Sequence, residues 1–249
     1  MAVRFVAVGE LLVDVVAAGA GHGARIRVRP AGSAFNAAIA AVAAGADATV
    51  IGTVGDDEPG RMIVRELEAH GVRPNVAVVT GGATGTFLLT DGEIRVDRGD
   101  SHRPAAVEPA AAADVVLVSG YLPHAADVLR AAEGAWVALD AARLVELPPG
   151  GNAVVANEET ARRLTGLEAE DAAQALSEQR RLACVTLGPR GAIAAMGDRV
   201  ERAAPATTAT DGPGSGDVFA ATLLVALAQG DDLAAALARA TRAAVDSLA

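Results

Sequence analysis

Short, continuously apolar runs of strand length recur along the chain, separated by stretches rich in Ala, Leu, Glu and Arg that are typical of helices. Strands apolar on both faces must be covered on both faces, and helical connections bring successive strands into one parallel sheet. The expected strands are 3–8, 48–54, 115–119, 135–139, 153–156 and 182–187; the expected helices are 34–44, 59–70, 125–133 and 157–164. The pattern predicts a doubly wound α/β fold with a mostly parallel sheet and helices on both faces, organised as one domain over residues 1–249.

The charged residues and the single cysteine exclude several classes of site. All 21 basic residues are arginine, so a P-loop and Schiff-base chemistry, which both need lysine, are excluded. Cys184 is the only cysteine, which excludes an internal disulfide. The formal net charge of −10 argues against a nucleic-acid partner. Apolar runs shorter than about 18 residues argue against a membrane span, and we expect a cytoplasmic protein.

Two segments interrupt the alternation of strands and helices. Residues 86–98 read TFLLTDGEIRVDR, in which two runs of strand formers flank Asp91-Gly92, a strong signal for a tight hairpin. Residues 25–29 alternate Arg with Ile and Val, as in a strand exposed on one face. We expect these strands to form a small sheet that projects from the main domain as a lid, or an edge hairpin without a role.

The segment most informative about chemistry is ATDGPGSGDVFAATLL, residues 209–224, in which glycines and a proline lead into an apolar helix. Glycine lets the backbone bend tightly and approach a ligand. The amides of Gly214, Ser215 and Gly216 would then point outward at a helix N-terminus, which favours an anion such as phosphate. Asp217 beside such a site is suited to accept a proton from an attacking hydroxyl. The alternative is a simple turn whose carboxylate only favours the helix end.

This segment resembles a signature of the ribokinase-like carbohydrate kinases, the PfkB family, D-T-x-G-A-G-D-x-F. Here residues 211–219 read D-G-P-G-S-G-D-V-F, with Gly212 in place of Thr and Ser215 in place of Ala. Five further elements resemble the family in the same order: G-E-L-L-V-D at 9–14, P-A-G-S-A-F-N-A-A at 30–38, I-G-T-V-G-D-D-E-P-G at 51–60, N-E-E-T-A-R-R-L-T-G at 157–166 and V-T-L-G-P-R-G-A at 185–192. The resemblance therefore covers nearly the whole chain.

The resemblance implies a role for each matched residue. Asp217 would be the catalytic base, and the amides of Gly214, Ser215 and Gly216 the anion hole. Sugar contacts would come from Asp14, Gly32, Ser33 and Asn36, and nucleotide contacts from Asn157, Thr186, Gly188, Arg190 and Gly191. ATP and Mg²⁺ are the implied cofactors, with Asn157 near the phosphates and the metal, and the hairpin would be the family's lid. A homodimer formed through the lid is a further expectation.

The chain departs from the family pattern at several positions. Thr160 stands where the N-x-x-E glutamate is expected, which predicts weak metal affinity, and Thr241 stands where an Asn often meets the nucleotide. The family's monovalent-cation site, here K⁺ held partly by Asp211, is expected to be incomplete, because family members generally continue beyond the position of Ala249. Arg98 and Arg143 are candidates to neutralise phosphate or substrate charge, and Arg98 loosely resembles an arginine that binds the carboxylate of keto-sugar acids.

The leading expectation is an ATP-dependent kinase that acts on a small sugar or sugar acid. A nucleoside kinase on the same fold is one alternative, for which Phe35 and Tyr121 are the candidate platforms for a base. The other is a sugar-binding regulatory protein that has lost turnover, which Thr160 favours and the Gly214 to Asp217 segment opposes. The expected partners are a small molecule and ATP.

Overall fold

The computed structural model describes residues 1–18, 23, 25–90, 93–105, 113–204 and 214–247. Within them the main sheet has the strand order β13-β12-β11-β10-β9-β8-β1-β4-β5. Its strands are β1 (Arg4–Val8), β4 (Asp47–Gly55), β5 (Arg73–Val79), β8 (Val115–Ser119), β9 (Trp136–Asp140), β10 (Ala153–Asn157), β11 (Leu182–Thr186), β12 (Ala192–Met196) and β13 (Arg199–Ala203). Pairing from β5 through β11 is parallel, whereas β12 and β13 pair antiparallel at one edge. The predicted doubly wound, mostly parallel sheet is confirmed.

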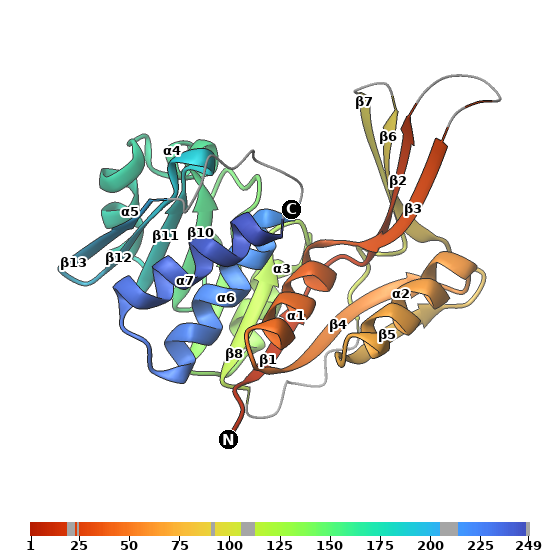
Figure 1. The fold of residues 1–249 in the computed structure, drawn as a ribbon, viewed down its shortest axis with the longest axis horizontal. Coiled ribbons are helices and arrows are strands. Elements are labelled where there is room, and N and C mark those ends of the chain that lie inside the picture. The colour runs from red at the N-terminus through yellow and green to blue at the C-terminus, as the bar shows by residue number, and fades with distance from the viewer. Residues whose placement is uncertain (19–22, 24, 91–92, 106–112, 205–213, 248–249) are drawn as a thin grey trace.

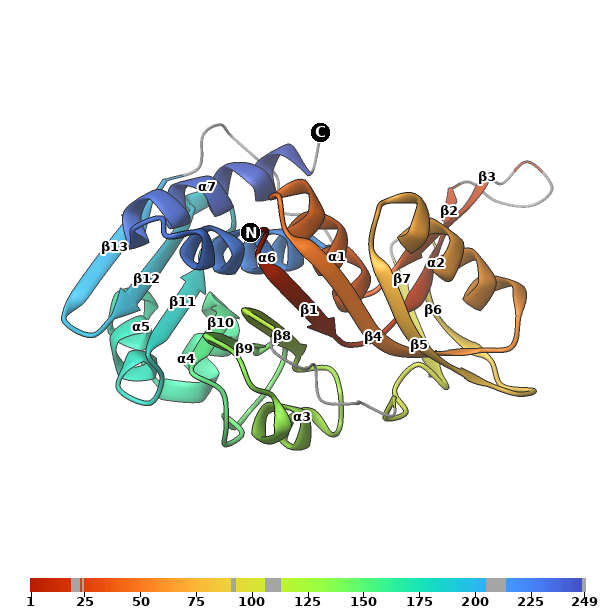
Figure 2. The ribbon, with the colours of Figure 1, turned by 90° about the horizontal axis from the view of Figure 1, so that it is seen from below.

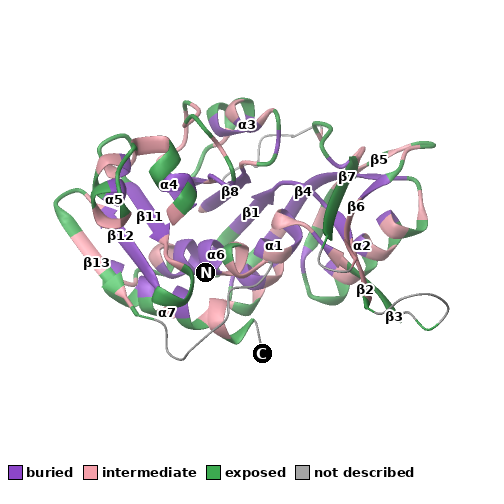
Figure 3. Ribbon diagram, turned by 90° about the horizontal axis from the view of Figure 1, so that it is seen from above, coloured by how far each residue is buried: buried purple, intermediate pink, exposed green. Residues whose placement is uncertain are grey.

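Helices cover both faces of this sheet, as Figure 2 shows. One face packs against α1 (Ser33–Ala43), α2 (Glu58–Ala69), α6 (Ser215–Gln229) and α7 (Leu233–Asp246). The other packs against α3 (Ala125–Ala131), α4 (Glu158–Thr165) and α5 (Ala169–Ser177). Alanine dominates the contacts between α1, α6 and the sheet, which lets these layers approach closely. The strands drawn as buried in Figure 3 include β1, β4, β8 and β11, which the sequence predicts from their continuous apolar character, and β12, which it does not.

A second sheet projects from the main one, as Figure 1 shows. Its order is β3-β2-β6-β7, built from β2 (Leu12–Ala18), β3 (Arg25–Ala31), β6 (Thr84–Thr90) and β7 (Glu93–Gly99). The antiparallel pair β6–β7 matches the predicted hairpin, whose turn lies outside the described residues. The structure adds β2 at the centre of this sheet, so Asp14 lies on a lid strand and not on the first strand of the main sheet. We call these four strands the lid.

The sheet order places a crevice next to β1. From β1 the chain builds β4 and β5 on one side and then crosses to β8 on the other. Ligands of doubly wound folds bind where the strand order reverses, beyond the carboxyl ends of the strands. Only Gly9, Glu10 and Leu11 separate β1 from β2, so the lid begins at this same place.

The opposite, amino-terminal end of β9 holds Trp136, which is 5% exposed. The guanidinium of Arg181 lies 4.2 Å from the centre of its ring, a cation–π contact. In the part of the chain described, none of the helices combines the length and the apolar character that a membrane span requires.

Candidate active site

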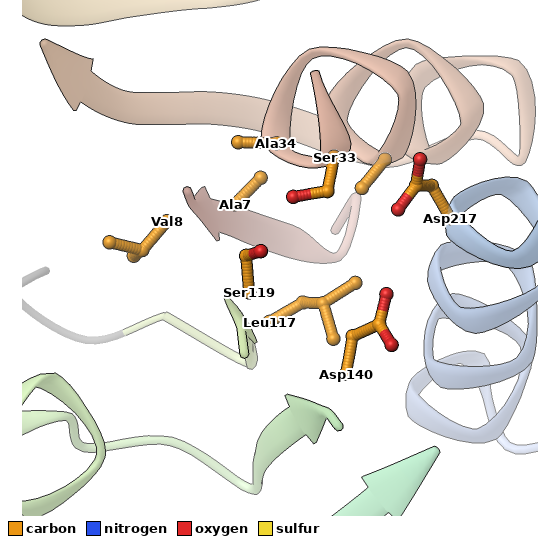
Figure 4. Close-up of a pocket in the computed structure, with 9 residues that line it drawn as sticks. Ala7, Val8, Ser33, Ala34, Leu117, Ser119, Asp140 and Asp217 are labelled. Atoms are coloured by element: carbon orange, nitrogen blue, oxygen red, sulfur yellow. The ribbon is translucent and has the colours of Figure 1, made fainter. Parts of the chain in front are cut away.

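A small pocket opens at the point where the strand order reverses, between the ends of β1 and β8 and the first turns of α1 and α6 (Figure 4). It brings together two carboxylates and two hydroxyls from four elements that are far apart in the sequence. Its lining residues are Ala7, Val8, Ser33, Ala34, Ala37, Leu117, Ser119, Asp140 and Asp217. Two of the predicted site residues, Ser33 and Asp217, therefore meet in one pocket.

Asp217 lies in the first turn of α6 and is held there by a neighbouring helix. The side-chain amide of Asn36, on α1, donates a 2.8 Å hydrogen bond to its Oδ2 atom. Gly214 caps α6 with φ of 88°, a left-handed conformation that favours glycine, and a Cβ atom there would lie 2.9 Å from Nδ2 of Asn36. The predicted glycine before the helix thus permits the contact between α1 and α6 that orients the carboxylate.

The N-terminus of α6 also presents its backbone to the site. The first amides of an α-helix have no carbonyl partner within the helix, and the N-cap residue of α6, Gly214, has no side chain that could cap them. Gly216 is exposed, and among the described residues no heavy atom outside its own helix turn lies within 4 Å of where a Cβ would be. Ser215 and Gly216 follow Gly214 directly in the first turn, so the segment has the form predicted for an anion hole, with open space at Gly216.

Asp140, which the sequence reasoning did not select, completes a pair of carboxyl groups. It ends β9 and lines the same pocket as Asp217, close enough for the charge of one carboxyl group to act on the other. Two carboxyl groups that interact in this way titrate as a pair. Burial, followed by the charge of Asp140, raises the pKa of Asp217 well above its ordinary value. Burial also raises the pKa of Asp140, although its Oδ1 atom accepts a 3.2 Å hydrogen bond from the amide of Ala142.

The start of α1 forms another wall of the pocket. Gly32 caps the helix with φ of 109°, and a Cβ atom there would lie 2.2 Å from the carbonyl oxygen of Glu10. The position therefore requires glycine. The buried hydroxyl of Ser33 has no hydrogen-bond partner among the described residues. A buried hydroxyl without a partner inside a pocket is suited to a hydrogen bond with a ligand.

The base of the lid carries two ion pairs. Asp14 accepts hydrogen bonds from Nε and Nη2 of Arg29, at 3.2 and 3.0 Å, and both atoms bond its Oδ2. Glu10, whose side chain is 4% exposed, accepts a 2.6 Å bond from Nε of Arg98. The guanidinium of Arg98 lies 5.9 Å from the ring centre of Tyr121. Burial raises the pKa of Glu10, although the charge of Arg98 opposes that rise.

The predicted nucleotide residues gather beyond β10 and β11, on the far side of Asp217 from the lid. Asn157 and Thr186 end these strands side by side. The side chain of Asn157 caps α4 by accepting a 2.8 Å bond from the amide of Thr160. Gly188 and Gly191 have φ of 57° and 89° in a tight turn closed by a 2.8 Å bond from the amide of Leu187 to the carbonyl of Gly191.

Several predicted residues already have partners within the protein. Arg190 forms an ion pair with Glu158, and Glu159 pairs with Arg163. Thr160 is buried, and its hydroxyl donates to the carbonyl of Ala142, so it faces the interior and not the nucleotide side. Neither adjacent glutamate is therefore free to replace the missing one.

Thr241 is buried in α7, where its hydroxyl donates to the carbonyl of Leu237 at 2.9 Å. Arg143 is exposed, and its charge acts on Tyr121 together with those of Asp140 and Asp217. Asp211 lies outside the described residues. The predicted roles of these three residues stay predictions.

Position in the sheet could have identified the residues that sequence reasoning missed. Asp140 and Ser119 each end a buried parallel strand at the edge where ligands bind. Glu10 has no such signal, because its partner Arg98 is 88 residues away in sequence and the pair forms only when β7 closes the lid sheet.

Comparisons with known proteins agree with this arrangement. The bifunctional protein HldE of Halorhodospira halophila is 31% identical over 290 residues, covering 97% of this chain and 59% of that protein. A ribokinase of Bacillus subtilis is 30% identical over 89% of this chain and 82% of its own length. The chain thus spans about three fifths of the first of these relatives and most of the second.

Solved structures show the same fold. The structure of Arabidopsis thaliana ribokinase complexed with ribose and ATP superposes with a TM-score of 0.85 at 24% identity, over 100% of this chain and 93% of that one. Adenosine kinase from Sinorhizobium meliloti gives a TM-score of 0.81 at 21% identity, over 98% and 93%. The sequence pattern of the pfkB family carbohydrate kinases matches residues 3–247. The chain therefore belongs to this family of phosphotransferases, which take an alcohol group as acceptor.

Proposed function

We propose that this protein transfers the γ-phosphoryl group of ATP to a hydroxyl of a small sugar or sugar derivative, with Asp217 as general base. The observation that carries this proposal is the carboxylate of Asp217, fixed by Asn36 at the N-terminus of α6 inside the pocket at the sheet's switch point. That position combines a proton acceptor with amides that favour a phosphoryl group.

The pocket residues divide the reaction between them. Asp217 accepts the proton of the attacking hydroxyl, and a raised pKa makes its ionised form a stronger base. The amides at the start of α6 stabilise the negative charge on the transferring group. Ser33 and Asp14 supply hydrogen-bonding groups for other hydroxyls of the acceptor, since only Oδ2 of Asp14 is bonded by Arg29.

Mg²⁺ would neutralise the phosphate charge when bound with ATP. Among the described residues, no cluster of three or more His, Cys, Asp or Glu side chains could hold the ion by itself. Mg²⁺ commonly keeps water and substrate phosphates as ligands and takes only one or two from the protein. The site therefore fits a metal that arrives with the nucleotide, with Asn157 the nearest predicted contact.

A sugar fits this pocket better than a nucleoside. The Sinorhizobium neighbour is an adenosine kinase, and a nucleoside base usually needs an aromatic platform. Here Phe35 is buried in the core, and the guanidinium of Arg98 already lies 5.9 Å from the ring centre of Tyr121. Among the relatives, the Bacillus ribokinase and a 2-dehydro-3-deoxygalactonokinase of Haloferax volcanii, 28% identical over 86% of this chain, bear names of sugar or sugar-acid kinases.

We also propose that two copies pair through their lids. The outer face of the lid carries Ile26 and Val28, which are 67% and 45% exposed, next to Val15 and Leu88. A row of apolar side chains on a solvent-exposed sheet is typical of a surface that another chain covers.

The proposal is tested by measuring ADP release with MgATP across a panel of sugars, sugar acids, sugar phosphates and nucleosides. Replacement Asp217→Asn keeps the size and the Asn36 contact but removes the base, and we expect kcat to fall by about 10²–10⁴-fold. The KM for ATP should change little. If wild-type protein binds a sugar and releases no ADP with any acceptor, the protein is a sugar-binding regulator and the kinase proposal is wrong.

A further inference from the structure

The charges on the lid are divided between its two faces. Side chains alternate along a strand, and residues paired across strands share a face. Arg29, Asp14, Phe87 and Val96 therefore form one row on one face. Further from the body, Arg27, Val16, Leu89 and Ile94 form the next row of that face, and Arg25 begins the row after it.

This face looks into the cleft. Arg98 lies two residues beyond Val96 on β7 and so shares its face, and it covers Tyr121. The amide of Tyr121 donates a 3.3 Å hydrogen bond to Oγ of Ser119, which lines the pocket together with Asp140 and Asp217. The stripe of arginines on β3 therefore runs from the acceptor side of the pocket toward the tip of the lid.

Two of these arginines are neutralised and two are not. Arg98 pairs with Glu10, and Arg29 pairs with Asp14. Arg25 and Arg27 are exposed, and within the described ranges neither has an acidic partner. In a chain with a formal charge of −10, the cleft face of the lid thus carries an excess of positive charge opposite a pair of carboxyl groups.

Protection of an edge strand does not account for this arrangement. Edge strands often carry charge to prevent pairing with other sheets, and β3 is an edge strand. Such protection does not require all charged side chains of the strand to share one face, whereas here the other face of β3 carries Ile26 and Val28. Because the chain has no lysine, the use of arginine and not lysine on β3 carries no information. The position of Arg25, Arg27 and Arg29 on the cleft face, however, needs another reason.

We propose that the acceptor is an anionic sugar derivative, whose phosphate or carboxylate group binds Arg27 while a hydroxyl binds Asp14. This inference rests on the proposed kinase function and narrows its substrate class. Arg27 lies two residues beyond Arg29 and Asp14, about 6.5–7 Å along the strand, so one small molecule can reach both groups. Guanidinium groups bind phosphate and carboxylate through paired hydrogen bonds.

The anion is a group of the acceptor and not of ATP. The predicted nucleotide residues lie beyond β10 and β11, whereas the lid begins at the end of β1, with β9 and β8 between them. Arg25, further out than Arg27, would assist by attracting the anion at long range.

The test compares matched acceptors with wild-type protein and two single variants. The acceptors are fructose against fructose 6-phosphate, ribose against ribose 5-phosphate, and glucose against gluconate, each assayed for ADP release and for binding by calorimetry. The variants are Arg27→Gln and a control, Arg199→Gln, which removes the same charge from exposed β13 at the far edge of the main sheet, where Arg199 pairs with Glu201.

We expect wild-type protein to favour one charged member of a pair, and Arg27→Gln to weaken that acceptor by about 10- to 100-fold in KM and binding. The KM for ATP of Arg27→Gln, and all values of Arg199→Gln, should stay unchanged. Preference for phosphate would identify a sugar phosphate, and preference for carboxylate a sugar acid. If neutral sugars are phosphorylated as well as or better than the charged members, or if Arg27→Gln binds every charged acceptor as wild type does, this inference is overturned. Absence of turnover with all acceptors contradicts the kinase function instead, and the calorimetry then decides the role of Arg27.

Discussion

At the scale of single residues, the carboxyl pair of Asp140 and Asp217 sets the chemistry of the pocket. A general base must be ionised to work, and the activity it supports is lost as pH falls through its pKa. Since burial and Asp140 raise the pKa of Asp217, the acidic limb of the pH–rate profile should lie above the range of an ordinary carboxylate. Such pairs titrate together, so the limb reports the pair and not one residue.

Replacement Asp140→Asn should move that limb to lower pH. Without the neighbouring negative charge Asp217 ionises more readily, and because it is then a weaker base, the plateau at high pH should also fall. The measurement is kcat/KM for the preferred acceptor between pH 4 and pH 9. Asp47→Asn, exposed at the amino end of β4, is the control and should leave the profile in place. If the acidic limb of the Asp140→Asn profile stays at the wild-type pH, whatever the value of kcat/KM on the plateau, Asp140 has only a structural role.

Gly214 and Gly216 differ in what a methyl group would cost. At Gly214 an alanine must adopt φ near 88° and press on Nδ2 of Asn36, so Gly214→Ala should lose about 1–3 kcal/mol of stability. For a chain of this size Tm falls by about 2–4 °C per kcal/mol. Gly216→Ala meets open space and should leave Tm unchanged or slightly higher. Calorimetric scans of both variants check this, and equal losses would contradict the conformational argument.

Sequence alone predicted the part of the site that local backbone chemistry dictates. Gly214, Gly32 and Asp217 could be selected because left-handed glycines and a helix start are encoded in adjacent residues. Asp140 could not be ranked above other acidic residues, because its role depends on a helix that begins 75 residues later. The same limit hid Arg29, whose partner Asp14 becomes visible only when β2 pairs with β3.

At the scale of elements, the lid is attached to the sheet through a buried charge. The raised pKa of Glu10 means that its ionised form is disfavoured by folding. The buried carboxylate therefore lowers the free energy of unfolding. This destabilisation is absent at low pH, where Glu10 is protonated, and develops as pH rises through the pKa of the folded state. Arg98 offsets that cost from β7 and so joins the outer hairpin of the lid to the segment between β1 and β2.

Removing this arginine should destabilise the protein more at high pH than at low pH. Arg98→Met leaves Glu10 buried without its partner, and we expect a loss of about 1–3 kcal/mol at pH 8, kept modest because Arg98 is 42% exposed. At pH 5 the loss should be smaller, since Glu10 then binds a proton more readily. The double variant Glu10→Gln/Arg98→Met should recover most of the loss at pH 8, and urea titrations at both pH values measure this. An effect of Arg98→Met that is independent of pH would contradict the role assigned to Glu10.

The sequence predicted best those strands and helices that have a clear apolar pattern. The six strands expected from continuous apolar runs are all present, with ends shifted by at most one residue. The pattern did not select β5, β13 and α5, because their mixed polar and apolar residues serve an edge or a half-exposed face. It also did not select β12, which is apolar and buried but consists mostly of alanine, a weak strand former. β2 was not among the expected strands, because Gly9, Glu10 and Leu11 give little sequence signal for the change of sheet.

At the scale of the whole molecule, pairing through the apolar outer face of the lid predicts that the protein is a dimer in solution. We expect light scattering to give twice the 24.8 kDa mass of one chain at micromolar concentration. Val28→Asp should shift this toward one chain, because it would bury an unpaired charge between the lids. Arg27→Gln, on the opposite face, should keep the wild-type mass. A wild-type protein that has the mass of one chain even at high concentration would rule out pairing through the lid.

Trp136 gives this protein an optical property of its own. It is the sole indole of the chain, and it is buried at the end of β9 opposite Asp140. Its fluorescence will therefore report unfolding of the main sheet. It should change little when an acceptor binds in the pocket at the opposite end of β9. The variant Tyr121→Trp would place a second fluorophore next to Arg98, where closing of the lid changes the surroundings of the new indole. Because the signal of Trp136 stays constant, the change in fluorescence would report lid closure.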